Sequence, residues 1–301
     1  MYRSAVRKAL VAVAASLFAA TAANSQTARV VSPVGVELPK ELIFEDATWI
    51  DGLGLVLFER GNPSVSVYRS GQNRQRQLNC SQRLAFLVGG GHNAILVDSA
   101  AKTMTSIDSS LSCVESERLP VSLTRILDVA RTKNSVVVLG RYADGTIQVR
   151  EFHTPGVENK PPEVVRLATT MAMRVMALYD GVFVVEARFP FKVVWRSPSD
   201  GEQDAAIADI PGIKGSRTYL LRSLRYGLHS DLLTIVDIFT GDRRTFVRRC
   251  SGKTVEELRL SPNVTPLRYD VSNQTLVGIS LGSKREIIEL PLERDRDDSC
   301  E

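Results

Sequence analysis

The chain has 301 residues, of which 44% are hydrophobic and 24% are charged, and its formal net charge is +4. This length is sufficient to bury an ample hydrophobic core. Three of the 38 basic residues, but none of the 34 acidic ones, fall within the first 25 positions, so the rest of the chain is almost neutral. The balance excludes wholesale binding to nucleic acid, and any basic character that matters must be local.

Residues 1–25 have the pattern of a secretory signal peptide. Arg3, Arg7 and Lys8 precede the apolar run ALVAVAASLFAATAA. Small residues then allow cleavage after Ala22 or Ser25. The sequence therefore predicts a periplasmic or secreted protein. The alternative is an uncleaved membrane anchor, because the apolar run is near the upper length for a signal peptide.

The remaining chain repeats one pattern of short strands. Apolar or alternating runs are separated by Gly, Asp, Asn and Ser, which is typical of an all-β protein. Six strand–turn–strand units recur at intervals of 41 to 50 residues, beginning at Leu53, Ala94, Ser135, Gly181, Asp231 and Gln274. A further short strand precedes each unit, and a more polar one follows most of them. Four antiparallel strands per repeat predict a six-bladed β-propeller over residues 26–294, followed by a tail at 295–301.

The two ends of the repeat region are expected to meet. The sixth unit has no evident fourth strand, whereas residues 28–38 form an extended stretch ahead of the first unit. We predict that this N-terminal strand completes the last blade and closes the ring, because closure covers an exposed strand edge. A seven-bladed ring and a two-sheet sandwich are the competing architectures.

Four cysteines follow the leader, at Cys80, Cys113, Cys250 and Cys300. An oxidising compartment favours their pairing into disulfides. Of three possible connectivities, 80–113 with 250–300 joins the partners that are nearest in sequence. Metal binding is the alternative, although no CxxC is present and the three histidines do not cluster with the thiols.

Arginines recur where the first strand of a blade begins. These strands are innermost in a propeller, so their arginines are predicted to gather around one opening. The set is Arg83, Arg125, Arg174, Arg222 (or Arg217 in the same blade) and Arg268, and blade one offers Glu45 and Asp46 at this place instead. Guanidinium groups suit carboxylate or phosphate, so the set predicts a small anionic ligand or an envelope or extracellular protein partner. In the alternative interpretation, each arginine pairs with an acidic residue of a neighbouring blade and ties the ring together.

The stretch FEDATWIDGLGLVLFE (44–59) resembles the opening E-G-P-x-W segment of the gluconolactonase-like enzymes, and the repeat resembles the wider group of six-bladed propellers that includes NHL-repeat proteins. The resemblance implies that Glu45 binds a divalent metal and that the alternative function is a metal-dependent lactonase or hydrolase. The chain departs from the motif at Asp46 and Ala47, and the family's Asn and Asp ligands have no matching position. A binding module without a cofactor is therefore the favoured hypothesis.

Three other motifs have simpler explanations. Ser280 in GISLG (278–282) matches a serine nucleophile elbow, but that motif requires a following helix and a hairpin is expected here. The glycines of GGGH (89–92) are interpreted as turn residues. His92, His229, Asp51 and Asp180 are predicted to form a polar rim on the face opposite the arginines, as solvated turn residues or as a transition-metal site. A third hypothesis makes the propeller a subunit of an envelope assembly.

Overall fold

A computed structural model describes the following residues: 46–58, 64–69, 72–78, 86–90, 92–132, 135–155, 164–166, 172–178, 181–188, 192–196, 204–206, 218–225, 229–237, 240–250, 254–258, 260, 264–270, 274–281 and 285–292. Some sequence predictions concern residues outside these ranges. They are the signal peptide, the closing strand at 28–38, the tail at 295–301, Glu45, Cys80, Arg83, Asp180, Arg217 and Cys300. These stay predictions.

The described strands form six antiparallel sheets, and each sheet takes its strands consecutively from the chain. The first contains β1 (Asp46–Ile50), β2 (Gly54–Phe58), β3 (Ser64–Arg69) and β4 (Gln72–Gln77). The second contains β5 (Phe86–Gly90), β6 (Asn93–Asp98), β7 (Thr103–Ile107) and β8 (Cys113–Arg118). The third contains β9 (Leu123–Arg131), β10 (Ser135–Tyr142), β11 (Ile147–His153) and β12 (Val164–Arg166).

The second half of the chain continues the series. The fourth sheet contains β13 (Ala172–Leu178), β14 (Gly181–Arg188), β15 (Lys192–Arg196) and β16 (Asp204–Ala206). The fifth contains β17 (Thr218–Arg225), β18 (Ser230–Asp237), β19 (Arg243–Arg249) and β20 (Thr254–Leu258). The sixth has three strands among the described residues: β21 (Val264–Asp270), β22 (Thr275–Leu281) and β23 (Arg285–Pro291).

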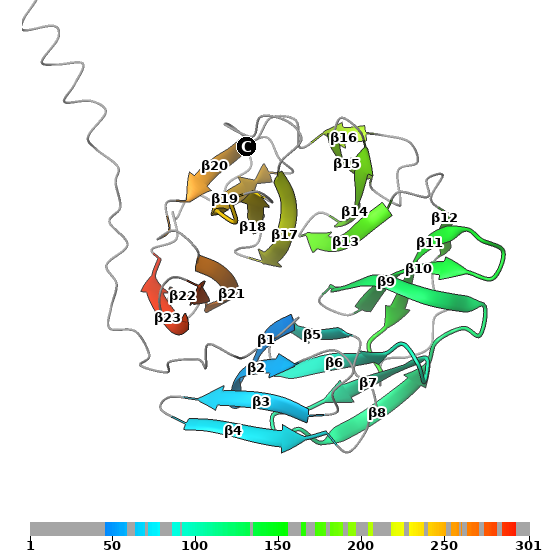
Figure 1. The fold of residues 1–301 in the computed structure, drawn as a ribbon, viewed down its shortest axis with the longest axis horizontal. Helices are drawn as coiled ribbons and strands as arrows, with labels where there is room; N and C mark the ends of the chain where they lie inside the picture. Colours follow the sequence, from blue (N-terminus) through cyan, green and yellow to red (C-terminus); the bar gives the residue numbers. More distant parts are fainter. Residues whose placement is uncertain are drawn as a thin grey trace, which may run out of the picture.

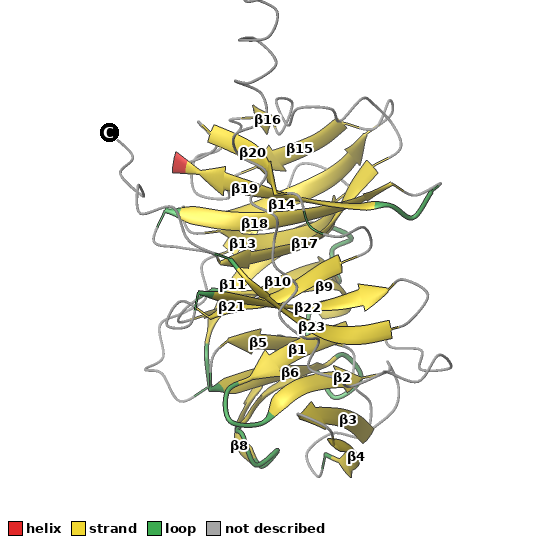
Figure 2. Cartoon of the chain, turned by 90° about the vertical axis from the view of Figure 1, so that its left-hand side faces the viewer, coloured by secondary structure: helices red, strands yellow, loops and turns green. Residues whose placement is uncertain are grey.

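The sheets surround one axis, with the first strand of each sheet innermost (Figure 1). β1 contacts β5, β5 contacts β9, and the series continues through β13, β17 and β21 back to β1. Seen from the side, the described part of the molecule consists of strands and connecting loops, apart from one short helical turn next to β19 (Figure 2). This arrangement is a β-propeller, and its sheets are numbered below as blades one to six in chain order.

β10 explains why a continuous apolar run forms a strand here. Val136 and Val138 belong to the cluster shared with blade two, whereas Val137 and Leu139 belong to the cluster shared with blade four. Alternate side chains of a strand point to opposite faces, so one run fills two interfaces. All four side chains are fully buried, and each burial contributes roughly 1.5–3 kcal/mol.

The first and last blades pack against each other in the same way. Leu55 and Leu57 of β2 share a hydrophobic cluster with Val277 and Ile279 of β22. Blade six therefore meets blade one through a buried apolar interface, although the two are more than 200 residues apart in sequence.

The all-β propeller prediction is confirmed, and the local pattern located its hairpins closely. All six predicted units begin within one residue of the start of a second strand, and Ser135 and Gly181 are the first residues of β10 and β14 themselves. The interpretation of the GGGH glycines as turn residues is wrong for Gly89. Gly89 lies inside β5, where an added Cβ would collide with Thr48 and crowd the Trp49 carbonyl of β1, so this glycine permits close packing of two inner strands.

Cys113 and Cys250 are each disulfide-bonded, and no described cysteine is free. Their connectivity stays a prediction, because Cys80 and Cys300 lie outside the described ranges. Among the residues that the structure describes, none belongs to a helix with the length and apolar character needed to cross a lipid bilayer.

Candidate functional site

The strand order gives the ring two chemically different ends. We call the end where the inner strands begin the start rim, and the end where they turn into the second strands the end rim. Because neighbouring strands are antiparallel, the turn between the second and third strands of each blade also lies at the start rim. Residues 119–125 and 141–146 therefore lie at the start rim, whereas Asp51, His92 and His229 lie at the end rim.

Four inner strands carry a charged residue directly after an irregularity in register. In β9, Leu139 pairs with Asp128 and Gly140 pairs with Ile126, which leaves Leu127 unpaired. β13, β17 and β21 skip one residue in the same way. The residues that follow the irregularity are Asp128, Arg174, Arg222 and Arg268.

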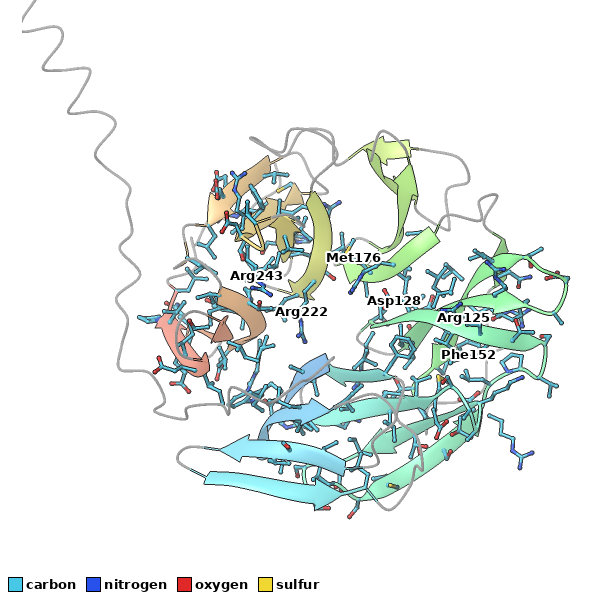
Figure 3. All side chains as sticks on the ribbon, viewed as in Figure 1. Arg125, Asp128, Phe152, Met176, Arg222 and Arg243 are labelled. Atoms are coloured by element: carbon cyan, nitrogen blue, oxygen red, sulfur yellow. The ribbon has the colours of Figure 1, made fainter. Side chains whose placement is uncertain are left out.

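A bulge bends its strand and redirects the side chain that follows it. Asp128, Arg174 and Arg222 each pair with the fifth residue of the second strand, so these three are structural equivalents, whereas Arg268 pairs with the third residue of β22 and lies closer to the turn. In blade three Asp128 has the place of Arg174 relative to this bulge, whereas Arg125 follows a second irregularity of β9, at which Thr124 is skipped. Figure 3 shows Asp128 nearer the centre of the ring than Arg125. The two arginines therefore have different environments, and Arg174 is half-buried whereas Arg125 is exposed.

Arg222 connects two blades that are not neighbours. Its Nη2 donates a hydrogen bond of 2.8 Å to the backbone carbonyl of Ala47 in β1. The side chain leaves β17 in the direction of the space between the inner strands (Figure 3). Blade five is thereby tied to blade one past blade six, which is a structural use of an arginine that faces the axis.

Arg268 belongs to the end rim. Its guanidinium is ion-paired with Asp51 of blade one, its Nη2 lies 3.8 Å from Oδ2 of Asp270, and its Cζ lies 6.0 Å from the centre of the Trp49 ring. The second Asp51 oxygen lies 3.8 Å from Nδ1 of His92 in blade two. These contacts join blades six, one and two, so the expectation that Arg268 lies on the face opposite Asp51 is wrong.

Blade three is tied to both of its neighbours by polar side chains that the sequence analysis did not single out. Arg131 donates to the backbone oxygen and to Oδ1 of Asn93 in blade two, at 3.1 Å and 2.7 Å. Burial lowers the pKa of Arg131 from its ordinary value. Asp128 accepts a hydrogen bond of 2.9 Å from the backbone N–H of Val175 in blade four. The clue in the sequence was the presence of Asp128 and Arg131 in the second half of β9.

Two arginines at the start rim of blade three, in contrast, have no such partners among the described residues. Arg125 and Arg141 are directly opposite each other in the β9–β10 register, and both are exposed. Within the described part of the chain, neither guanidinium takes part in a hydrogen bond or ion pair. Like charges directly opposite on a sheet are unfavourable by about 0.2–1 kcal/mol, and nothing described here compensates them.

A third arginine of blade three is fixed in place. Arg150 lies 4.2 Å from the centre of the Tyr142 ring and donates to Oε1 of Gln148 at 3.0 Å and 3.2 Å. Burial raises the pKa of Tyr142 to about 12, and its hydroxyl is buried without a hydrogen-bond partner. Arg150 thus contacts a neutral ring and a neutral amide, so its positive charge is not neutralised by either and adds to the positive charge of blade three.

The other expected site residues are not gathered into one centre. His229 is exposed, and its carbonyl accepts a hydrogen bond from the Cys250 backbone. Ser280 lies in β22 and is followed by β23, so the strand-turn-helix of a nucleophile elbow is absent there. In the part of the chain that the structure describes, no three His, Cys, Asp or Glu residues are grouped as a metal site would require.

Comparison with known proteins finds distant structural similarities and no match in sequence. No family model and no curated protein matches the sequence. A putative TolB from Agrobacterium tumefaciens is 14% identical over 73% of this chain and 82% of that chain, with a TM-score of 0.48. The β-propeller domain of the trilobed protease from Pyrococcus furiosus is 9% identical over 84% and 82%, with a TM-score of 0.46. The WD40 β-propeller domain of Doa1 is 11% identical over 88% and 97%, with a TM-score of 0.38.

Proposed function

We propose that this chain is an exported β-propeller that binds an anionic group, of a protein partner or of a small ligand, at the start rim. In this proposal the six sheets form a closed six-bladed ring, residues 28–38 complete blade six, and residues 1–25 are removed on export. Disulfides join Cys80 to Cys113 and Cys250 to Cys300. Glu45 and Arg83 stay candidate ligand contacts of blades one and two.

One observation carries the proposal: the exposed pair Arg125 and Arg141 has no acidic partner among the described residues. Their Cα atoms are paired across two strands, so their side chains rise from the same face of the sheet. Two neighbouring guanidinium groups repel each other, and a carboxylate or phosphate between them removes that repulsion while accepting hydrogen bonds from both. Arg222 and Arg268, in contrast, already serve to hold the ring together.

The test compares binding with folding. Isothermal titration calorimetry with inorganic pyrophosphate and with poly-L-glutamate is performed on the wild type and on R125A/R141A. Loss of two charge-assisted hydrogen bonds is expected to weaken binding about tenfold or more. Binding by the wild type is also expected to weaken as salt rises, because the site is exposed.

A matched control lowers the net charge by the same two units elsewhere. Ser109 and Gln274 are exposed turn residues at the end rim, so S109E/Q274E changes the charge without touching Arg125 or Arg141. The control is expected to bind both probes as the wild type does, and all three proteins to melt at similar temperatures. Equal binding by R125A/R141A and the wild type would overturn the proposal.

A further inference from the structure

We infer that the start rim of blades two and three docks an acidic polypeptide segment that carries an apolar side chain. The inference rests on the proposed function and narrows its ligand from an anion to a polypeptide. The docking surface consists of Lys102, Arg118, Val121, Arg125 and Arg141, and is called the blade 2–3 rim below. It lies where β8 ends, β9 begins and β10 ends.

Val121 is the apolar element of the blade 2–3 rim. Its exposure is 88%, and only it and Val114 are exposed large hydrophobic residues within the described ranges. Val121 lies in the short connection between β8 and β9, whereas Val114 lies near the opposite end of β8. An apolar side chain presented to water beside cations suits a partner that can cover it.

The loop that carries Val121 is held firmly. The Leu123 N–H donates to the Pro120 carbonyl at 3.0 Å, and the Leu119 N–H donates to the Lys102 carbonyl at 2.8 Å. The Lys102 ammonium then donates to the Val121 carbonyl at 3.0 Å. These bonds fix the position of the exposed side chain before any partner arrives, which lowers the entropy lost on binding.

A further bond joins this loop to the arginine pair. The Ala143 N–H at the end of β10 donates to the Ser122 carbonyl at 2.8 Å, and the Thr124 hydroxyl donates to the Arg141 carbonyl at 2.9 Å. Val121 and Arg141 therefore belong to one continuous piece of surface, although they are 20 positions apart in sequence.

The charges of the blade 2–3 rim are predominantly positive. Arg118, Arg125 and Arg141 are exposed there. Two of the nearby acids are engaged in turns of their own, and a third, the half-buried Glu117, directly precedes Arg118 in β8. Asp98 is buried and accepts hydrogen bonds from the N–H groups of Ala100 and Ala101, and Asp144 accepts from the backbone and hydroxyl of Thr146.

Charge complementarity selects the partner, because a basic surface attracts and orients an acidic one. The apolar centre then separates a polypeptide from a small anion. A phosphate or a carboxylic acid needs only the guanidinium pair and gains nothing from Val121. An acidic segment with one apolar side chain uses both elements, in the arrangement of an apolar core with a polar surround that protein interfaces adopt.

Three probes test the inference by fluorescence anisotropy and calorimetry: a labelled peptide of alternating Glu and Leu, a matched peptide of Glu and Ser, and inorganic pyrophosphate. They are titrated into the full mature chain, V121S, R125A/R141A and the control S109E/Q274E. We expect the Glu–Leu peptide to bind about fivefold more tightly than the Glu–Ser peptide, from the partial burial of Val121 and one Leu side chain. V121S is expected to remove that difference, and R125A/R141A to remove binding of both peptides.

The outcomes separate the inference from the proposed function. Pyrophosphate binding that depends on Arg125 and Arg141, without peptide binding, would leave the proposed function intact and overturn the inference. An unchanged preference for the Glu–Leu peptide in V121S would also overturn it, since thermal melts identify any unfolded variant. Failure of every probe would overturn both. If S109E/Q274E loses as much peptide affinity as R125A/R141A does, the loss is caused by the change in net charge, and the blade 2–3 rim is not the binding site.

Discussion

The two rims of this propeller use arginine in opposite ways. At the end rim, Arg268 is paired with Asp51 and Arg131 is bonded to Asn93, so each charge or dipole is matched by a neighbouring blade. At the start rim, Arg125 and Arg141 are opposite each other and exposed. An arginine on an inner strand is therefore a candidate for ligand binding only if its side chain is not already bonded to a neighbouring blade.

The largest expected effect comes from the end rim of blade five, where Asp231 is fully buried and lies 3.7 Å from Nη1 of Arg248. Asp231→Ala is expected to destabilise the protein by about 3–5 kcal/mol, because Arg248 is left as a buried charge without this partner. Urea unfolding measures the change. The control is Asp242→Ala, an exposed residue of the same blade. A loss for Asp231→Ala as small as that of the control would contradict the matched character of this rim.

The close approach of β5 to β1 gives the next effect. Gly89→Ala places a methyl group against Thr48 and the Trp49 carbonyl, and we expect a loss of about 1–3 kcal/mol from overpacking. Gly145→Ala is not a suitable control, because Gly145 has a φ of +80° and would be strained for a different reason. Comparison with G89A/T48A, which removes the Thr48 hydroxyl that the added methyl group would meet, shows whether the loss is steric. An unchanged melting temperature for Gly89→Ala would show that the inner strands are not packed this closely.

A smaller loss is expected at the junction of blades six and one. Arg268 is 28% exposed, so its ion pair with Asp51 is partly screened by solvent and Arg268→Ala is expected to lower the stability by about 1 kcal/mol. A double-mutant cycle with Asp51→Ala measures the coupling directly. The coupling is expected to be favourable and to diminish as salt rises. A coupling of zero would mean that hydrophobic packing alone joins the two blades.

The smallest effect, with the opposite sign, belongs to the start rim. R125A/R141A is expected to leave the stability unchanged or to raise it by about 0.2–1 kcal/mol, because it removes a like-charged cross-strand pair. The same urea titrations provide the measurement. A loss comparable with that of Arg268→Ala would place these arginines among the structural ones and remove the contrast between the rims.

Local sequence patterns predicted the strands well for a definite reason. Runs such as SVVVLG and AILV are apolar at successive positions because both faces of a second strand are covered by neighbouring blades. Turn residues then mark where each hairpin begins, and Gly181 has a φ of +149°. Apolar runs and turn residues are visible in the sequence itself, so the fold class and the strand boundaries could be predicted from it.

The site was less accessible, because its residues are related by register and not by spacing. An arginine near the start of an apolar run looked equivalent in TRILDVA and MRVMALY, yet β9 skips two residues and β13 skips one, and the register aligns Asp128 with Arg174. A bulge depends on how a strand pairs with its neighbour, so no local pattern displays it. Arg141 was not predicted for the same reason, since only the β9–β10 register places it beside Arg125.

The sequence by itself determined that this chain alternates short strands and turns at a regular interval, because burial on two faces and backbone turns leave local traces. Only the tertiary structure decided which charged groups meet. Arg222 reaches Ala47 across 175 positions, and Arg268 reaches Asp51 across the junction of the first and last blades. Ring geometry brings residues that are distant in sequence within a few ångströms, and it thereby separates the arginines that hold the ring from those that remain exposed to solvent.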